Sequence, residues 1–443
     1  VRVNIVGLLG IVAALVALIV MVYKGLHVLI AGTIAALLVA ITNGLGAVDG
    51  YSVVYLGGVG GFVVSNLAIY LWGGIFGELY NASGAARSIA HAISRLFKGK
   101  KEHTSVLTSI LIIFVAGVLM SYGGISGIVL MMVLMPLTLE IIKESRIPRY
   151  MAPGILLGAL ATAALAMPGS PQIQNSGPIQ YLGTTSMAAA IPGFIGGAVV
   201  IVLNIVYLNY AANREISAGR VYVDAEFDES MRVKSNEDLP NPIMALLPLI
   251  VTFMLFNFMK LYIGFSIIIG ILTALVCFWR YLGGVKLVMG VLGKGVAAAC
   301  VLCLSSGALA GFGTVVQATE TFGQFSIALT NIQGPPLFIV MIAIMLVTAI
   351  CGSGPAAIGA SLPMFYDTFV SMGVSMSAVH RIAAFSATTL DTLPTNAGFI
   401  AAAGLARSEA KDSYKYVGMC TVVNTTIATA VVTLLLTLFP GLA

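Results

Sequence analysis

Two apolar stretches of this chain are each interrupted by proline and asparagine. The first interruption covers residues 168–177 and the second covers residues 393–398, and their asparagines, Asn175 and Asn396, lie 221 positions apart. A helix that is broken at membrane depth persists only where protein or a wet cavity satisfies its freed N–H and C=O groups. Matched breaks in the two halves of a chain are typical of the substrate site of a membrane transporter. The pair therefore predicts a binding site built from broken spans.

The composition indicates a chain that lies in a membrane. Of the 443 residues, 59% are apolar and 9% are charged, whereas soluble domains carry about 25% charged residues. Interrupted apolar stretches fill residues 105–142, 150–185, 336–370 and 377–406. A helix needs about 20 apolar residues to cross a bilayer, and we expect uninterrupted spans at residues 3–22, 26–45, 51–72, 188–209, 242–258, 262–279, 295–315 and 416–438. The sequence thus predicts an all-α polytopic membrane protein.

The two halves of the chain carry a weak internal repeat. Residues 74–84 align with residues 313–323 at a constant offset of 239, and glycine-rich turns at 123–127 and 352–354 each precede one of the two breaks. On this pattern each half contains about five spans plus a re-entrant hairpin and a broken helix. Because five is an odd number of crossings, the second half is expected to have the inverted topology of the first.

Lysine and arginine predict the orientation, because cytoplasmic loops carry an excess of both. Only Arg2, Lys260 and Arg381 are expected on or near the outer side, so both termini should be periplasmic or extracellular. The linker between the halves, residues 210–241, holds seven of the 17 acidic residues and is predicted to be a solvated cytoplasmic loop. The other basic residues concentrate in segments expected in the cytoplasm: 95–101, 143–149, 210–241, 280–286 and 407–415.

Other classes of function find little support. The net charge of +5 is spread over short loops, so nucleic acid is not an expected partner. The four histidines stand apart from cysteines and carboxylates, and no GxSxG motif surrounds Ser353, so we predict no metal site, no cofactor and no catalytic residue. A membrane-embedded enzyme remains the alternative of another class. The cysteines lie in apolar segments and are expected to pack there: Cys277, Cys300, Cys303, Cys351 and Cys420.

Four segments supply the candidate substrate site, namely the two breaks and the two glycine-rich hairpin tips. At a break, the N–H ends of one half-helix can hold an anion and the carbonyl ends of the other can hold a cation. Glycine lets a ligand approach the backbone, and hydroxyl and amide side chains supply hydrogen bonds. None of the four segments contains Lys or Arg, so a substrate carboxylate is expected to be held by neutral groups. The candidate substrate-binding residues are Ser121, Gly123, Gly124, Ser126, Gln172, Gln174, Asn175, Ser176, Ser353, Gly354, Thr392, Thr395 and Asn396.

One carboxylate lies beside the second break. Asp391 is five positions before Asn396, within the interrupted apolar stretch 377–406. An ionisable side chain inside a membrane is costly and is by default functional. Asp391 is therefore the predicted proton carrier.

At these segments the chain resembles the gluconate permease (GntP) family of proton-coupled organic-anion symporters, part of the ion transporter superfamily. The resemblance rests on the hairpin segments 119–136 and 352–359 and on the breaks 168–178 and 392–399. It implies a homodimer whose transport parts move like elevators against a static scaffold. It also implies scaffold parts at residues 1–104 and 242–335, transport parts at residues 105–209 and 336–443, and the linker 210–241 between them.

The chain departs from the family pattern at two of these four segments, the first hairpin and the second break. Ser121-Tyr122-Gly123 occupies a stretch where gluconate permeases tend to carry an acidic residue, and Leu393 and Asn396 replace a His and an Asp. Gluconate, 3-hydroxybutyrate and lactate are therefore all open as substrates.

We predict a secondary active transporter of the bacterial inner membrane that moves a small hydroxy-monocarboxylate with a proton. Sodium remains open as the coupling ion. A sodium-coupled carrier of di- or tricarboxylates is the alternative within transport.

Overall fold

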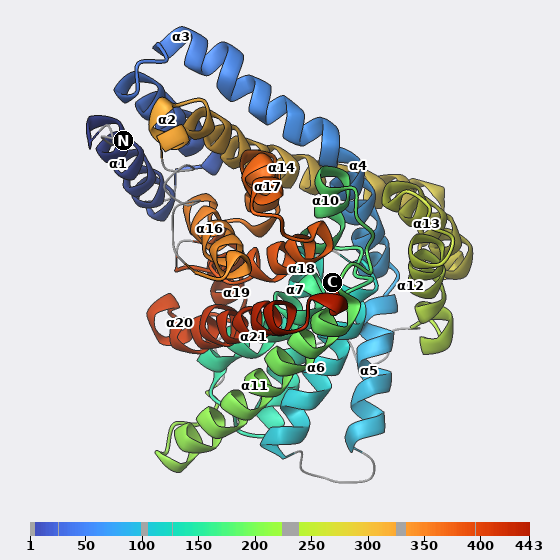
Figure 1. Cartoon of the computed structure of the whole chain (residues 1–443). Coiled ribbons are helices and arrows are strands. Elements are labelled where there is room, and N and C mark those ends of the chain that lie inside the picture. Colours follow the sequence, from blue (N-terminus) through green and yellow to red (C-terminus); the bar gives the residue numbers. More distant parts are fainter. Residues whose placement is uncertain are drawn as a thin grey trace.

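The computed structural model describes residues 5–24, 26–98, 105–125, 127–223, 239–324, 334–394 and 396–443, and no strand occurs in these ranges. The helices form one bundle (Figure 1). Those of the first half are α1 (Ile5–Tyr23), α2 (Val28–Thr42), α3 (Ala47–Asp49), α4 (Leu56–Ala82), α5 (Ala85–Lys98), α6 (Val106–Tyr122), α7 (Gly127–Glu144), α8 (Ala152–Leu160), α9 (Ala163–Ala166), α10 (Ile173–Leu182) and α11 (Ala190–Ser217). Those of the second half are α12 (Pro242–Asn257), α13 (Ile263–Phe278), α14 (Val285–Gln317), α16 (Pro336–Cys351), α17 (Gly354–Ser371), α18 (Met376–Ser386), α19 (Ala397–Leu405), α20 (Ala410–Gly418) and α21 (Asn424–Leu438).

The predicted polytopic, all-helical membrane architecture is confirmed. Five shorter apolar helices include α1, α2 and α6, and the interrupted stretches of the sequence are the hairpins and the broken helices. Six helical stretches of the described chain are long and apolar enough to cross a bilayer: Ala47–Ala82, Arg149–Ala166, Ala190–Ser217, Ile263–Tyr281, Val285–Gln317 and Ala410–Leu438.

The long helices α4 and α14 approach each other closely at glycines near both ends of their contact. A Cβ atom on Gly58 would lie 3.0 Å from the Cα of Gly311, and one on Gly74 would lie 2.9 Å from the carbonyl oxygen of Gly295. The partners of Gly58 and Gly74 thus run in opposite order along α14, so the two helices are antiparallel. Small residues at both ends of the contact let the backbones approach closely, as in other membrane helix pairs.

A second antiparallel pair is formed by the long helices α11 and α21. Gly196 of α11 faces Val432 of α21, and eight residues farther along α11 the buried amide of Asn424 donates to Asn204 Oδ1 at 2.9 Å. Asn204 and Asn424 are 220 positions apart, nearly the spacing of the two breaks. Antiparallel contact between corresponding helices is what inverted repeats require, so both pairs support that prediction.

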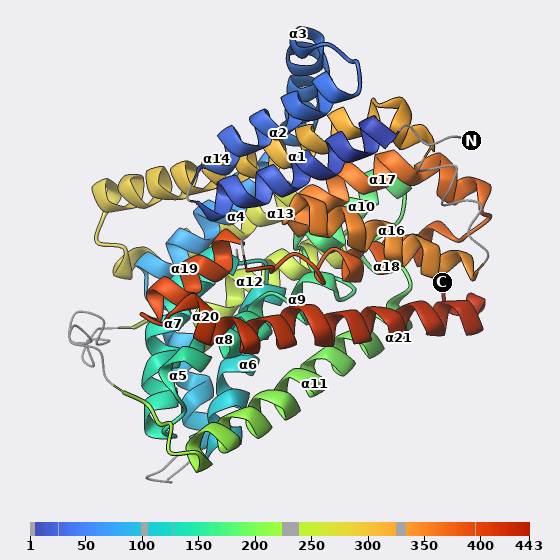
Figure 2. The same ribbon diagram turned by 90° about the vertical axis from the view of Figure 1, so that its left-hand side faces the viewer.

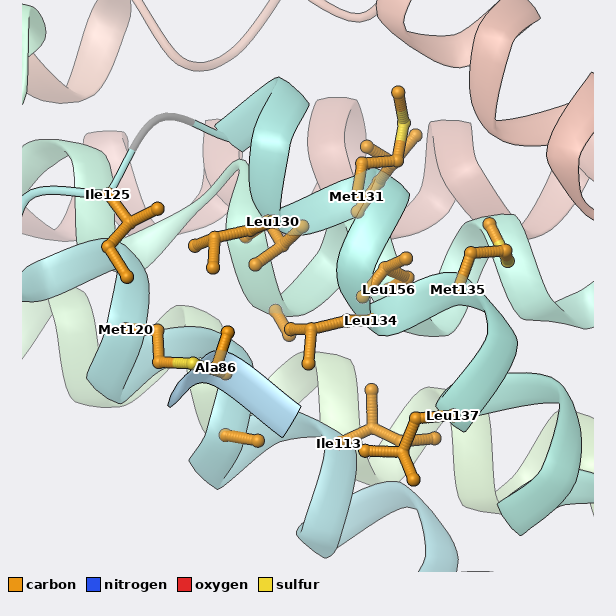
Figure 3. Close-up of a cluster of buried hydrophobic side chains, with 14 of the residues drawn as sticks. Ala86, Ile113, Met120, Ile125, Leu130, Met131, Leu134, Met135, Leu137 and Leu156 are labelled. Carbon is orange, nitrogen blue, oxygen red and sulfur yellow. The ribbon is translucent and has the colours of Figure 1, made fainter. Parts of the chain in front are cut away.

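The two predicted hairpins are present: the first consists of α6 and α7, and the second consists of α16 and α17. The arms of the first hairpin share an apolar core with α5 and α8, in which Met120, Leu134 and Leu156 are buried (Figure 3). Tight packing of this kind leaves few voids and resists deformation. The hairpin tip, where α6 ends at Tyr122, is therefore carried on a rigid support.

The segment that joins the halves begins later than predicted. Helix α11 continues to Ser217, and residues 218–223 follow it without helical structure. Residues 224–238 lie outside the described ranges. Glu215 is 6% exposed because it is bound to Arg220, to Lys415 (3.3 Å) and to the hydroxyls of Tyr150 and Tyr416 (both 2.7 Å). This cluster fastens the end of α11 to α20.

The ends of the bundle agree with an even number of crossings. In Figure 2, α1 begins and α21 ends on the right, whereas α11 runs to the lower left before the linker. The two ends of the described chain thus lie on one side, and the linker leaves from the other. Which side is cytoplasmic stays a prediction from the charge bias.

The contact between α4 and α14 yields a matched pair of variants. We expect Gly295→Ala to lower the thermal unfolding midpoint of the purified protein, because its Cβ would lie 2.7 Å from the Cα of Ile75 and overpacking costs about 1–3 kcal/mol. Gly293→Ala is the control on the same helix, where a Cβ meets no atom within 4 Å and alanine favours the helix by up to about 1 kcal/mol. Equal midpoints for the two variants would contradict the contact.

Candidate functional site

The first break lies inside the protein, and the second is only partly buried. In the first, α9 ends at Ala166 and α10 begins at Ile173; in the second, α18 ends at Ser386 and α19 begins at Ala397. Asn175 is fully buried and Thr392 is 4% exposed, whereas Pro394 is exposed. Protein groups therefore surround the interrupted backbone of the first break, as a break at membrane depth requires.

The first break is tied to the first hairpin tip by Gln172. Its Nε2 donates to the carbonyl oxygens of Ser121 (2.7 Å) and Ile125 (3.0 Å), which lie at the end of α6 and in the tip. The hydroxyl of Ser121 in turn donates to Leu160 O at 3.2 Å. Gly124 has φ +102° and packs on Pro171, a conformation that side-chain-bearing residues rarely adopt. Tip and break thus form one unit.

The second break is tied to the second hairpin tip by Asn396. Its Oδ1 caps α19 by accepting from Phe399 N at 3.0 Å, and its Nδ2 donates to Asp391 O (3.0 Å) and Gly352 O (3.4 Å). Ser353 Oγ lies 3.5 Å from Ala356 N and caps α17. An amide side chain therefore joins break to tip in both halves, from different sequence positions.

The two halves meet where α17 begins. A Cβ on Gly354 would lie 3.1 Å from Gln174 Nε2 of the first break and would clash with the carbonyl oxygen of Ala387 of the second. The N–H of Gly354 interacts with the half-buried carboxyl group of Asp391. One glycine thus brings the second tip into contact with both breaks, and Gln174, Gly354 and Asp391 form the centre of the candidate site.

Two residues of α18, His380 and Arg381, contact Asn175 in the first break, and the sequence reasoning missed both as site residues. Asn175 Nδ2 donates to Ser170 O (2.8 Å) and Ser186 O (3.2 Å), while its Oδ1 accepts from Arg381 Nη1 at 2.9 Å and lies 3.3 Å from His380 Nε2. In this conformation the Asn175 amide holds the break together. A role for Asn175 as a direct substrate ligand stays a prediction.

Arg381, which the charge bias predicts on or near the outer side, lies inside the protein and not in a loop. The side chain is fully buried, because its five N–H groups reach the carbonyl oxygens of Ala166, Ser186 and Ala188 and the amide oxygen of Asn175. All of these partners are neutral, whereas most buried charges are paired with an opposite charge. The signal in the sequence was an ionisable residue within an apolar stretch.

A helix of the predicted scaffold also contacts the first break. Asn257 at the end of α12 donates to Gly169 O at 3.0 Å and accepts from Ser186 Oγ at 3.0 Å. Gly123 of the first tip packs on Leu249 of the same helix. The first half of the candidate site therefore rests on α12 through the two hydrogen bonds of Asn257 and through apolar contacts, which include the rings of Tyr122 and Phe253.

The remaining candidate residues lie near the site with various roles. Ser176 donates its hydroxyl to Pro171 O at 3.3 Å, and the carbonyl of Thr392 accepts from Tyr414 at 3.4 Å. Ser126 and Thr395 lie outside the described residues. Across the part of the chain that the structure describes, no group of three His, Cys, Asp or Glu side chains could hold a metal ion.

Comparisons with known proteins agree with this architecture. The profile of the GntP family permeases matches residues 6–439. An uncharacterized transporter of Bacillus subtilis (strain 168), YxjC, is 25% identical over 455 residues that cover 93% of this chain and 94% of that protein. The crystal structure of the Alcanivorax borkumensis YdaH transporter superposes with a TM-score of 0.57 at 13% identity over 89% of each chain, which shows a shared fold. Since the family profile covers nearly the whole chain, this protein belongs to the GntP permease family.

Proposed function

We propose that this permease is a secondary active transporter that carries a small hydroxy-monocarboxylate together with a proton across the bacterial inner membrane. The observation that carries the proposal is the meeting of Gln174, Gly354 and Asp391 where both breaks and the second hairpin tip converge. Half-helix N-termini at membrane depth carry partial positive charge and bind the anionic groups of substrates.

Asp391 supplies a route for coupling. When Asp391 is ionised, its carboxylate interacts with the backbone N–H of Gly354 at the start of α17. A substrate carboxylate would take the same position. Protonation removes the negative charge from Asp391 and leaves this helix N-terminus to the substrate. The anion then binds only together with a proton, which is the requirement for symport.

The charges at the site favour a substrate with one negative charge. Arg381 is the one Lys or Arg side chain in contact with a break in the described chain, and its N–H groups are all taken by protein oxygens. A second carboxylate would have no cation to balance it, and unbalanced charge is costly inside a membrane. Substrate hydroxyls would be bound by neutral amides such as Gln174.

Alternating access is proposed to follow an elevator-like path. The first break rests on α12 through the Asn257 and Gly123 contacts, which would be exchanged for others as the site moves, whereas α4 and α14 approach each other closely at glycines. The helices around α4 and α14 would be the static part of a homodimer. The hairpins and broken helices would move as one body.

The proposal is tested by a panel of organic acids in proteoliposomes. Radiolabelled gluconate, 3-hydroxybutyrate, lactate, succinate and citrate are each offered with an inward proton gradient and then with an inward sodium gradient. We expect a monocarboxylate to accumulate unchanged with the proton gradient. Accumulation of succinate or citrate with the sodium gradient would instead support a sodium-coupled carrier, and conversion of the acid would support an enzyme.

Asp391→Asn should abolish the stimulation of uptake by an inward proton gradient, because asparagine neither binds nor releases the proton. Exchange of unlabelled for labelled substrate across the membrane should persist, since it needs no net proton movement. Asp367→Asn is the matched control, because Asp367 is an exposed carboxylate on α17. Proton stimulation that survives in Asp391→Asn would place the proton carrier elsewhere.

Asn396→Ala and Asn175→Ala should each abolish uptake in the same assay while the amount of protein in the membrane stays normal. The first removes the cap of α19, worth about 1 kcal/mol, and the bond to Gly352. The second removes four hydrogen bonds within the first break. Asn213→Ala, at an exposed site on α11, is the control. Uptake at the wild-type rate in either variant would remove that residue from the site.

A further inference from the structure

The guanidinium of Arg381 lies where a broken membrane helix would otherwise bind a cation. Its acceptors are Ala166 O at the end of α9, Ser186 O and Ala188 O before α11, and Asn175 Oδ1 of α10. These oxygens come from three segments of the first break and point at one fully buried positive charge. Converging carbonyls of unwound membrane segments and half-helix ends are the ligands by which transporters coordinate Na⁺.

A short sequence match places Asp391 of the second break opposite Ala166 of the first. Ala161-Thr162 and Leu165 of the first half correspond to Ala387-Thr388 and Leu390 of the second, at offsets of 226 and 225. Ala166 therefore corresponds to Asp391. The carbonyl of Ala166 accepts from Arg381, whereas the carbonyl of Asp391 accepts from the neutral amide of Asn396 at 3.0 Å.

The contrast between the halves is one of charge. The first break holds a permanent positive charge that no ion can displace while the guanidinium is in place. The second break holds a titratable carboxyl group next to a carbonyl and an amide, and it can bind a proton or a small cation there.

We propose that Arg381 is a built-in replacement for a coupling cation at the first break, so that the only exchangeable cation site among the residues that the structure describes is the one at Asp391 in the second break. Removing the guanidinium would uncover a set of oxygens suited to Na⁺. This inference deepens the proposed function, because it assigns the coupling site, but its test requires no knowledge of the transported acid.

The experiment measures the thermal unfolding of the purified full-length protein in NaCl and in choline chloride at equal ionic strength. A ligand that binds only the folded state raises the unfolding midpoint. The variants are the wild type, Arg381→Lys, which keeps the charge, and Arg381→Gln, which removes it, each also with Asp391→Asn.

We expect Arg381→Gln to gain a Na⁺-specific rise of about 1–2 °C for each tenfold increase in NaCl, and we expect Asp391→Asn to leave this rise unchanged. The wild type and Arg381→Lys should show either no Na⁺-specific rise or one that Asp391→Asn abolishes. Folded Arg381→Gln that responds alike to both salts would overturn the proposal, because Arg381 would then be only a structural clamp.

The wild type tests the proposal even if Arg381→Gln does not fold. A Na⁺-specific rise in the wild type that survives Asp391→Asn would show a cation site other than the one at Asp391 and would overturn the proposal. The proposed transport function fails separately, when no acid of the panel accumulates in proteoliposomes.

Discussion

The structure depends on one constraint: backbone groups that a helix break exposes inside a membrane must be satisfied by protein. Gln172 and Asn396 meet it by joining each break to its own hairpin tip, and Asn175 and Arg381 meet it within the first break. The polar residues of this chain therefore gather at the breaks because that is where the backbone needs them. The same groups leave the N-terminal ends of half-helices directed at the middle of the protein.

The positions of the two breaks depend on how the two halves of the chain pack against each other. Helices α4 and α14 approach through glycines at both ends of their contact, and α11 and α21 cross at a buried pair of asparagines. Both pairs are antiparallel, and each joins corresponding parts of the two halves. Within this arrangement the two breaks come together at Gly354, which lies against Gln174 of the first break and Ala387 of the second.

The sequence predicted the apolar helices, the hairpins and the two breaks, because long apolar runs and their interruptions by proline and asparagine are visible in it. It also identified Gln172, Asn175 and Asn396 as residues of the breaks. It could not predict that Gln174 lies beside Gly354, because that contact joins segments 180 positions apart and depends on the packing of α10 against α17. The role of Arg381 was missed for a related reason: counting basic residues assumes that each lies in a loop, whereas the side chain of Arg381 is buried at the first break.

The position of Arg381 bears on how the site can move across a bilayer. A buried charge carries a cost of several kcal/mol unless its surroundings compensate it, and here the guanidinium donates five hydrogen bonds to neutral oxygens. In the proposed coupling, an ionised Asp391 balances Arg381 in the empty carrier, and a bound mono-anion takes over that balance when Asp391 is protonated. The empty carrier and the carrier loaded with both proton and anion then have the same net charge at the breaks, so the electrostatic cost of crossing the low-dielectric core is the same for both. A carrier loaded with the anion alone or with the proton alone would have a different net charge and a higher cost. One fixed cation and one titratable carboxylate thus provide, by charge alone, a reason for the proton and the anion to move together.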